Sequence, residues 1–210
     1  MPLYKTITIN STTNLLIWKI EEPYEILLEG IELTENCKER LSHMKSEIHR
    51  RGFLSVRQLL KAAGYKSSDL FYDNNGKPHL KDGTHISITH SFIFSGIIIS
   101  SNIGVGIDIE KQRDKIQKIA HKFVGYEWNY LSNERLTEKL SVIWCAKESM
   151  YKDFATKGMS FKKHTKVIPF DLEEGKTVAW VFYRGTVQKY KVHYFPVDGF
   201  MCAYALKSKV

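Results

Sequence analysis

The sequence predicts an α+β protein, because strand-like and helix-like apolar patterns alternate in blocks along the chain. Strand patterns come first, amphipathic helical patterns follow, and the same succession returns in the second half. The 210 residues, 43% of them hydrophobic, suffice for one large domain or two small ones. We therefore expect two α+β halves of similar size, 1–103 and 104–210, although no internal repeat is strong enough to prove a duplication.

The helical patterns begin with apolar residues at spacings of three and four over 33–48, with Thr34 as the expected cap. Gly52 is expected to interrupt this helix, and a second one runs over 53–63 until Gly64. In the second half, helices are expected within 111–130 and 131–152. Strands are predicted at 3–9, 14–20, 86–91, 94–101, 103–110, 167–170, 177–183, 187–195 and 200–206.

Charge and cysteine usage limit the class of protein. The formal net charge is +8, which favours anionic partners such as nucleic acids, phosphate-bearing ligands or acidic proteins. Cys37, Cys145 and Cys202 form neither a CxxC pair nor a metal-ligand spacing, so we expect reduced, buried thiols. No apolar run approaches the ~20 residues of a membrane span. These features predict a cytoplasmic protein that makes no contact with a membrane.

Two carboxylates lie two residues apart on the expected strand 103–110. Side chains at this spacing project to one face, so Asp108 and Glu110 should lie side by side. Gly104 and Gly106, just before them, allow another backbone or a ligand to come close. Two neighbouring acids repel each other unless a cation lies between them. A D-x-E triplet by itself is a weak signal, and a salt-bridge network with nearby lysines explains it equally well.

The helical segment 144–152 strengthens this signal. Lys147, Glu148 and Lys152 follow Trp144 at offsets of three, four and eight, which places them on one helix face. Glu148 would then add a third oxygen ligand to the pair on the strand. An all-oxygen ligand set suits Mg²⁺, which also binds substrate phosphates.

These motifs together resemble those of the 4′-phosphopantetheinyl transferases, and more closely those of the larger, pseudo-dimeric group that activates surfactin and enterobactin synthetases. The likeness runs from about Arg50 to Ala205. It rests on these segments: Val56–Leu60, Gly76–Pro78, Ile86–Ser91, Gly106–Glu110, Phe123–Glu127, Trp144–Lys152 and Lys157–Ser160. Thr89 stands where this family usually has a serine. The resemblance implies two halves related by a pseudo-two-fold, with the active site at their seam.

The resemblance also implies a reaction. The family transfers phosphopantetheine from coenzyme A to a serine of an acyl or peptidyl carrier protein, and adenosine 3′,5′-bisphosphate leaves. Asp108, Glu110 and Glu148 would hold Mg²⁺, with Mn²⁺ as an alternative ion. Lys147 and Lys152 would bind pyrophosphate oxygens or balance the acids. Glu148 is also placed to accept the serine proton, so its roles as base and as metal ligand remain competing assignments.

By the same resemblance, residues of the first half bind the adenosine end of coenzyme A. His90 would contact the 3′-phosphate, Lys77 and Arg57 would add positive charge, and Pro78 would shape the adenine pocket. Without the surrounding motif, His90 would be read as an ordinary core histidine. Glu127 is the weaker case, because a surface glutamate on a helix requires no function.

The expected partner is an acidic carrier protein, attracted by the net positive charge of a monomeric enzyme. Its docking surface would include apolar residues that could equally well cover the core: Ile116, Ile119, Phe123 and Val124. Two other functions compete with this one. A Mg²⁺-dependent nuclease would also need acids and lysines, but the usual acid-x-Lys strand is missing. A non-catalytic nucleic-acid-binding module fits the charge, but no recognised motif supports it, so no nucleic-acid partner is expected.

Overall fold

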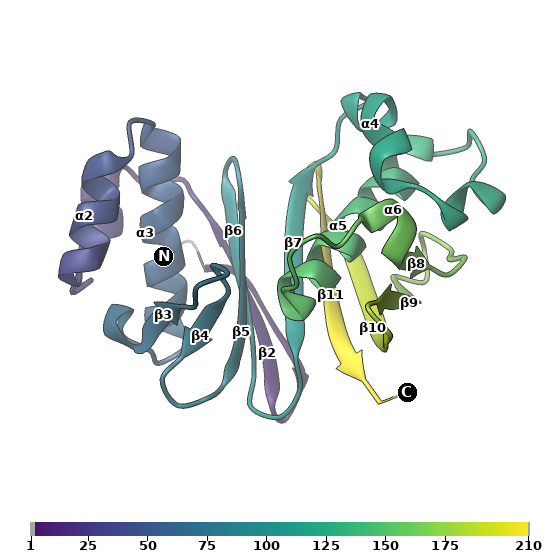
Figure 1. Ribbon diagram of the computed structural model, residues 1–210. Helices are drawn as coiled ribbons and strands as arrows, with labels where there is room; N and C mark the ends of the chain where they lie inside the picture. The colour runs from purple at the N-terminus through teal and green to yellow at the C-terminus, as the bar shows by residue number, and fades with distance from the viewer. Residues whose placement is uncertain (1–2, 210) are drawn as a thin grey trace. The chain divides into compact units, whose positions relative to one another are not determined.

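Antiparallel sheets covered by helices make up both parts of the chain, which confirms the predicted α+β class (Figure 1). The computed structural model describes residues 3–209. The chain divides into an N-terminal unit, Met1–Asn102, and a C-terminal unit, Ile103–Val210. Within the described residues, none of the helices combines the length and the apolar character needed to cross a membrane.

The N-terminal unit is built on a four-stranded antiparallel sheet in the order β1-β2-β6-β5. Its strands are β1 (Leu3–Asn10), β2 (Thr13–Lys19), β5 (His85–Ser91) and β6 (Phe94–Ser100). A separate hairpin pairs β3 (Leu70–Tyr72) with β4 (Pro78–Leu80). His90 lies near the end of β5, paired with Ser95 of β6.

Three helices belong to this unit, namely α1 (Tyr24–Leu28), α2 (Glu35–His43) and α3 (Glu47–Ala62), and a 3-10 turn, η1, spans Ser67–Asp69. Thr34 caps α2 as expected, since its hydroxyl oxygen accepts a hydrogen bond from the Cys37 amide at 3.2 Å. The expected interruption at Gly52 is wrong. The break falls between the two helices at Met44–Ser46, and Gly52 lies inside α3.

The position of Gly52 has a packing reason. A Cβ there would lie 3.0 Å from Cδ2 of His90, so the missing side chain makes room for the histidine ring against α3. The apolar side of α3, which includes Phe53, Leu54 and Leu59, is buried with residues of β2 and β6. This burial of an amphipathic face outweighs the ~1 kcal/mol that a glycine costs inside a helix.

The C-terminal unit contains a five-stranded antiparallel sheet in the order β7-β11-β10-β9-β8. The strands are β7 (Val105–Lys111), β8 (Thr165–Val167), β9 (Lys176–Tyr183), β10 (Thr186–Val197) and β11 (Phe200–Ser208). The strand expected at 167–170 ends earlier, at Val167, shortly before Pro169, which cannot donate a ladder hydrogen bond.

The 19-residue helix α5 (Leu136–Phe154) packs on this sheet, mainly against β7 and β11. Two shorter helices and a 3-10 turn lie around it: α4 (Lys115–Phe123), η2 (Tyr126–Asn129) and α6 (Phe161–His164). The core of the unit combines Ile143, Ala146 and Met150 of α5 with Val181 and Tyr190 of the sheet. The packing of α5 on β7 places the two segments that carry the predicted acids side by side.

Candidate active site

The close packing of α5 on β7 depends on a glycine. A Cβ at Gly106 would overlap the backbone carbonyl of Ser149, so only glycine fits at this crossing. Ser149 also ties the helix to the sheet, because its hydroxyl donates hydrogen bonds to the carbonyls of Cys145 (2.7 Å) and Ala203 (3.0 Å). The helix turn that carries Glu148 is therefore held directly beside the strand that carries Asp108.

Asp108 and Lys152 form an ion pair across this contact. Asp108 is only 5% exposed, and its Oδ1 accepts a hydrogen bond from Lys152 Nζ at 2.8 Å. The same ammonium donates to the carbonyl oxygen of Ile107, also at 2.8 Å. Lys152 thus neutralises one of the acids, as the salt-bridge reading of the sequence allowed, and its partly exposed head remains at the edge of the cluster.

Glu148 has a carboxyl group with a strongly raised pKa. Burial, followed by repulsion from Asp108, raises its pKa to about 7; Lys152 opposes this shift and Glu110 adds to it. Because Asp108 and Glu110 both act on Glu148, the structure brings the three predicted acids within electrostatic reach of one another. The site therefore carries an excess of negative charge that one lysine does not remove.

The chemistry of this cluster fits a hard divalent cation. Its donors are carboxylate oxygens, the ligands that Mg²⁺ prefers; besides burial, repulsion from Asp108 and Glu110 raises the pKa of Glu148, and a cation would relieve that repulsion. In the described part of the chain, however, no three acidic, histidine or cysteine side chains already surround a common point. Lys152 bonds to one oxygen of Asp108, so side-chain rotation would have to accompany the binding of an ion.

Lys147 does not join this cluster. Its Nζ lies 2.7 Å from Oε1 of Glu127, and both side chains are fully buried. Burial lowers the pKa of Lys147, and the contact with Glu127 opposes this shift. The expectation that Lys147, Glu148 and Lys152 share one face is therefore corrected: Lys147 and Lys152 are five residues apart, about 140° around a helix axis.

Glu127 is likewise not the surface residue that the sequence suggested. It lies in η2, fully buried.

Trp144 lies one turn before Glu148 on α5. Its ring makes edge contacts with Phe123 (centroids 5.1 Å apart) and Phe161 (5.8 Å). Beside it lies a pocket of about 220 Å³, lined by Glu110, Lys111, Arg113, Lys115, Ile116, Ile119 and Trp144. Of the four apolar residues considered for docking, Phe123 and Val124 are buried in the core, whereas Ile116 and Ile119 remain half-buried at this pocket.

In the N-terminal unit, His90 and Arg57 line one pocket of about 290 Å³. Arg40, His49 and Tyr72 line it as well. The His49 and His90 ring centroids are 6.4 Å apart. Sequence reasoning missed these three additional residues, although the basic run over 49–51 was visible. The pocket combines several cationic or protonatable groups with aromatic rings, which suits an anion attached to a planar base.

Arg57 is the buried cation of this pocket. It is 5% exposed, its Nη1 donates to the Phe53 carbonyl at 3.2 Å, and its Nη2 lies 3.7 Å from the Cys37 sulfur. No described residue accepts a hydrogen bond from its Nε. Burial lowers the pKa of Arg57. A buried guanidinium with such weak partners can gain much from an anionic ligand.

Lys77 and Pro78 lie in the hairpin next to this pocket. The Lys77 amide donates to Oδ1 of Asp73 at 3.0 Å, which closes the turn, and Pro78 begins β4 opposite Tyr72. Of these three hairpin residues, Tyr72 is the one that lines the pocket.

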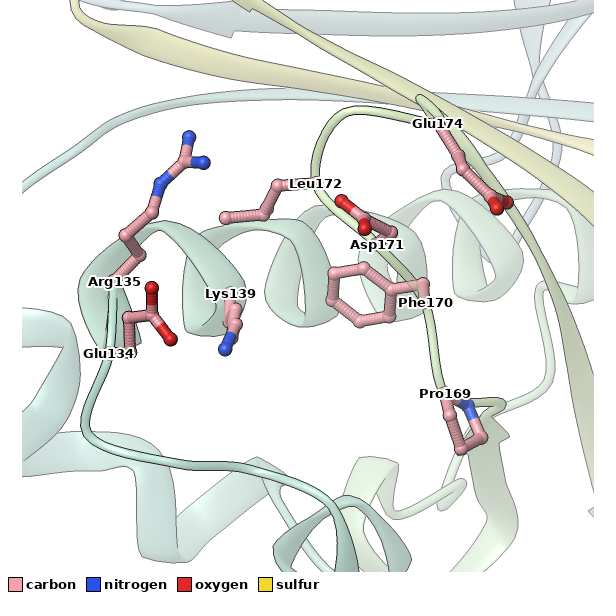
Figure 2. A pocket seen from close by; sticks show the side chains of 8 residues that line it. All are labelled: Glu134, Arg135, Lys139, Pro169, Phe170, Asp171, Leu172 and Glu174. Atoms are coloured by element: carbon pink, nitrogen blue, oxygen red, sulfur yellow. The ribbon is translucent and has the colours of Figure 1, made fainter.

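A larger cavity, of about 480 Å³, lies elsewhere, at the N-terminal end of α5 (Figure 2). Lys139 and Phe170 flank it, and Arg135 at its rim is already paired with Glu138 and Glu173 at 2.8 and 2.6 Å. None of the predicted site residues lines this cavity. Glu148 lies about 14 Å along the helix axis from Lys139, which lines this cavity.

The raised pKa of Glu148 predicts an unusual pH dependence of stability. A carboxyl whose pKa is higher in the folded state (about 7) than its ordinary value of 4.5 stabilises the fold below the lower value, and this contribution disappears as the pH rises through 7. Relative to Glu148→Gln, the metal-free wild type should lose up to about 3 kcal/mol of unfolding free energy between pH 4.5 and 8. Urea unfolding of both proteins across this range tests it, and parallel curves would contradict it.

One comparison with known proteins gave a match. Residues 104–205 match the family model of the 4′-phosphopantetheinyl transferase superfamily. A search of curated proteins found no significant match. The matched range contains the three acids, Lys152 and the packing of α5 on β7. The C-terminal unit therefore belongs to the 4′-phosphopantetheinyl transferase superfamily.

Proposed function

We propose that this protein transfers the 4′-phosphopantetheine group of coenzyme A to a serine hydroxyl of an apo acyl or peptidyl carrier protein, with release of adenosine 3′,5′-bisphosphate. The observation that carries the proposal is the electrostatic coupling of Asp108, Glu110 and Glu148, beside Lys152, within the range that matches the superfamily. Phosphoryl transfer depends mostly on positioning and on charge neutralisation, and this cluster has the groups for both.

In this proposal Asp108, Glu110 and Glu148 hold Mg²⁺, or Mn²⁺ in its place. Once bound, the ion would offset negative charge on the pyrophosphate of coenzyme A. Lys152 lies at the edge of the same cluster, so its ammonium can pair with a pyrophosphate oxygen when the ion replaces it at Asp108. The reaction then proceeds by attack of the serine oxygen on the β-phosphorus and departure of the bisphosphate.

Two assignments compete for Glu148. Its pKa of about 7 suits a group that accepts the serine proton near neutral pH. The same group completes the set of metal ligands, and a carboxylate committed to a cation has a lower pKa. If a metal-bound water accepts the serine proton instead, Glu148 can serve as a metal ligand.

The N-terminal unit supplies contacts to the adenosine end of coenzyme A in this proposal. His90 and Arg57 bind the 3′-phosphate in the pocket they share, with Arg40 and His49 adding positive charge. Tyr72 and Pro78 border the adenine, and Lys77 contributes charge from the neighbouring turn. The weak hydrogen bonding of the buried Arg57 guanidinium supports this assignment.

The proposed partner is an acidic carrier protein, and the proposed enzyme is a cytoplasmic monomer. The pocket beside Trp144 supports this choice of partner, because three basic side chains surround the half-buried Ile116 and Ile119. An apolar centre with a basic rim is complementary to an acidic helix that carries a few apolar residues.

Intact-protein mass spectrometry tests the function. Incubated with coenzyme A and Mg²⁺, the protein should make an apo carrier heavier by one phosphopantetheine group, and a carrier with its acceptor serine changed to alanine should keep its mass. Failure with every apo carrier of the source organism would overturn the proposal, and cleavage of nucleic acid by the same preparation would favour a nuclease.

A further inference from the structure

The ion pair between Lys147 and Glu127 is the most deeply buried charged contact among the described residues. Lys147 Nζ and Glu127 Oε1 are 2.7 Å apart, and neither side chain has any exposed surface. Lys147 is the residue immediately before Glu148 on α5, whereas Glu127 lies in η2. The pair therefore connects the helix of the acidic cluster to a separate segment of the C-terminal unit.

Further hydrogen bonds satisfy the two charged groups. Lys147 Nζ also donates to the carbonyl oxygens of Phe123 (2.8 Å) and Phe161 (3.2 Å). Glu127 accepts from the amides of Val167 (2.9 Å, at Oε1) and Gly125 (3.0 Å, at Oε2). The pair thus joins the end of α4, the turn η2, the start of α6 and β8 to one point on α5.

The aromatic packing converges on the same point. Trp144, one turn before Lys147, contacts the rings of Phe123 and Phe161, whose carbonyls accept the lysine hydrogen bonds. This helix turn is held by an ion pair and by the edge contacts of the Trp144 ring with two phenylalanine rings. Glu148 is the next residue along α5, so these contacts fix the rotation of the helix that sets its position.

Moving Lys147 to a ligand would break this arrangement. Its ammonium would have to leave three oxygen acceptors, and Glu127 would remain as an uncompensated charge without access to water. Removing one partner of a buried ion pair is strongly unfavourable. Lys152 is less enclosed, since its side chain is 26% exposed and the proposed cation would take its place beside Asp108.

We infer that Lys147 and Glu127 are positioning residues, which fix the turn of α5 that presents Glu148 and do not touch coenzyme A. This inference rests on the proposed function and deepens it, because it divides the two lysines of the helix between different tasks. Lys152 contacts the phosphates, and Lys147 sets the orientation of the carboxylate next to it.

The test compares Lys147→Met, Glu127→Gln and their double variant with Lys152→Met. Lys139→Met is the matched control, since the ammonium of this lysine, on the same helix, donates to the exposed Ser132 hydroxyl at 3.2 Å, away from the acidic cluster. Turnover and the KM for coenzyme A are measured per folded molecule, counted by circular dichroism. Calorimetry gives the affinity for coenzyme A without a carrier, and melting curves give stability.

In the Lys147 and Glu127 variants, kcat should fall by about a hundredfold, while KM and affinity for coenzyme A stay within about twofold. Lys152→Met should weaken coenzyme A binding instead, and Lys139→Met should behave as wild type. The double variant should melt at a higher temperature than Lys147→Met alone, because no unpaired charge remains buried.

Two results would overturn the inference. A tenfold or larger loss of coenzyme A affinity in Lys147→Met, with Glu127→Gln unaffected, would show that the lysine contacts the ligand. Wild-type kcat in folded Glu127→Gln, which is the isosteric variant and the less disruptive one, would show that the pair only supports the fold. An inactive wild type would contradict the proposed function, and the melting and calorimetric comparisons would still decide the role of the pair.

Discussion

Asp108→Asn should abolish phosphopantetheine transfer while the protein remains folded. The substitution keeps the shape of the side chain but removes the charge that Lys152 neutralises and that the proposed cation requires. Loss of a group at the reacting centre typically costs about 10²–10⁴ in rate. Asp108→Asn should also lose the proposed metal ion, so we expect its rate to fall by the larger factor of that range. Glu148→Gln should give a similar loss, whichever of its two roles is correct.

The measurement is the rate at which an apo carrier gains mass under saturating coenzyme A and Mg²⁺. Asp114→Asn serves as the control, because this exposed carboxylate accepts a hydrogen bond from Thr137 (2.6 Å) outside the acidic cluster. It should leave the rate unchanged. Full activity of both Asp108→Asn and Glu148→Gln would mean that the acids do not form the reaction centre.

Gly106→Ala should be among the most destabilising single changes in the C-terminal unit. The new methyl group would overlap the Ser149 carbonyl, which is part of the α5 backbone and cannot rotate away. The helix would have to move off β7 and weaken the Ser149 hydrogen bond to the Ala203 carbonyl on β11. Overpacking typically costs 1–3 kcal/mol, and we expect about 3 kcal/mol or more here.

Urea unfolding provides the comparison, with Gly64→Ala as the control. Gly64 has a positive φ of 85° but no atom within 4 Å of an added Cβ. The loss of unfolding free energy in Gly64→Ala therefore reflects backbone strain alone. That strain costs roughly 1–2 kcal/mol. Equal losses in the two variants would show that the contact between α5 and β7 tolerates a side chain at position 106. The surviving folded Gly106→Ala protein should also transfer slowly, because Glu148 would be displaced from Asp108.

The segment 104–110 illustrates how much the sequence could predict. Alternation of small or acidic residues with Ile107 and Ile109 fixes a strand and the face on which Asp108 and Glu110 lie, because side chains on a strand alternate strictly. The two isoleucines are buried, as expected. The prediction that the acids share a face depends only on this local periodicity, and for that reason it could be made without a structure.

Helix 136–154 illustrates where prediction failed. Offsets of three, four and eight from Trp144 suggested one common face. Lys147 and Lys152 nevertheless lie about 140° apart around the helix axis, so they can meet different neighbours. Which neighbour each lysine would meet depended on where α4, η2 and α6 return to the helix. Glu127 was misjudged for the same reason, since nothing within a few residues of it shows that it is enclosed on all sides.

The sequence alone determined the order of the longer strands and main helices, the presence of three acids and two lysines in two segments, and the resemblance to one transferase family, because these follow from local periodicity and residue type. It did not predict the short elements α1, β3, β4 and α6. Only the tertiary structure decided that Lys152 pairs with Asp108, that Lys147 pairs with Glu127, and that His49 and Arg40 share a pocket with His90 and Arg57. Contacts of this kind form between residues far apart in the chain. They depend on which side of each element is covered by its neighbours, which no local pattern encodes.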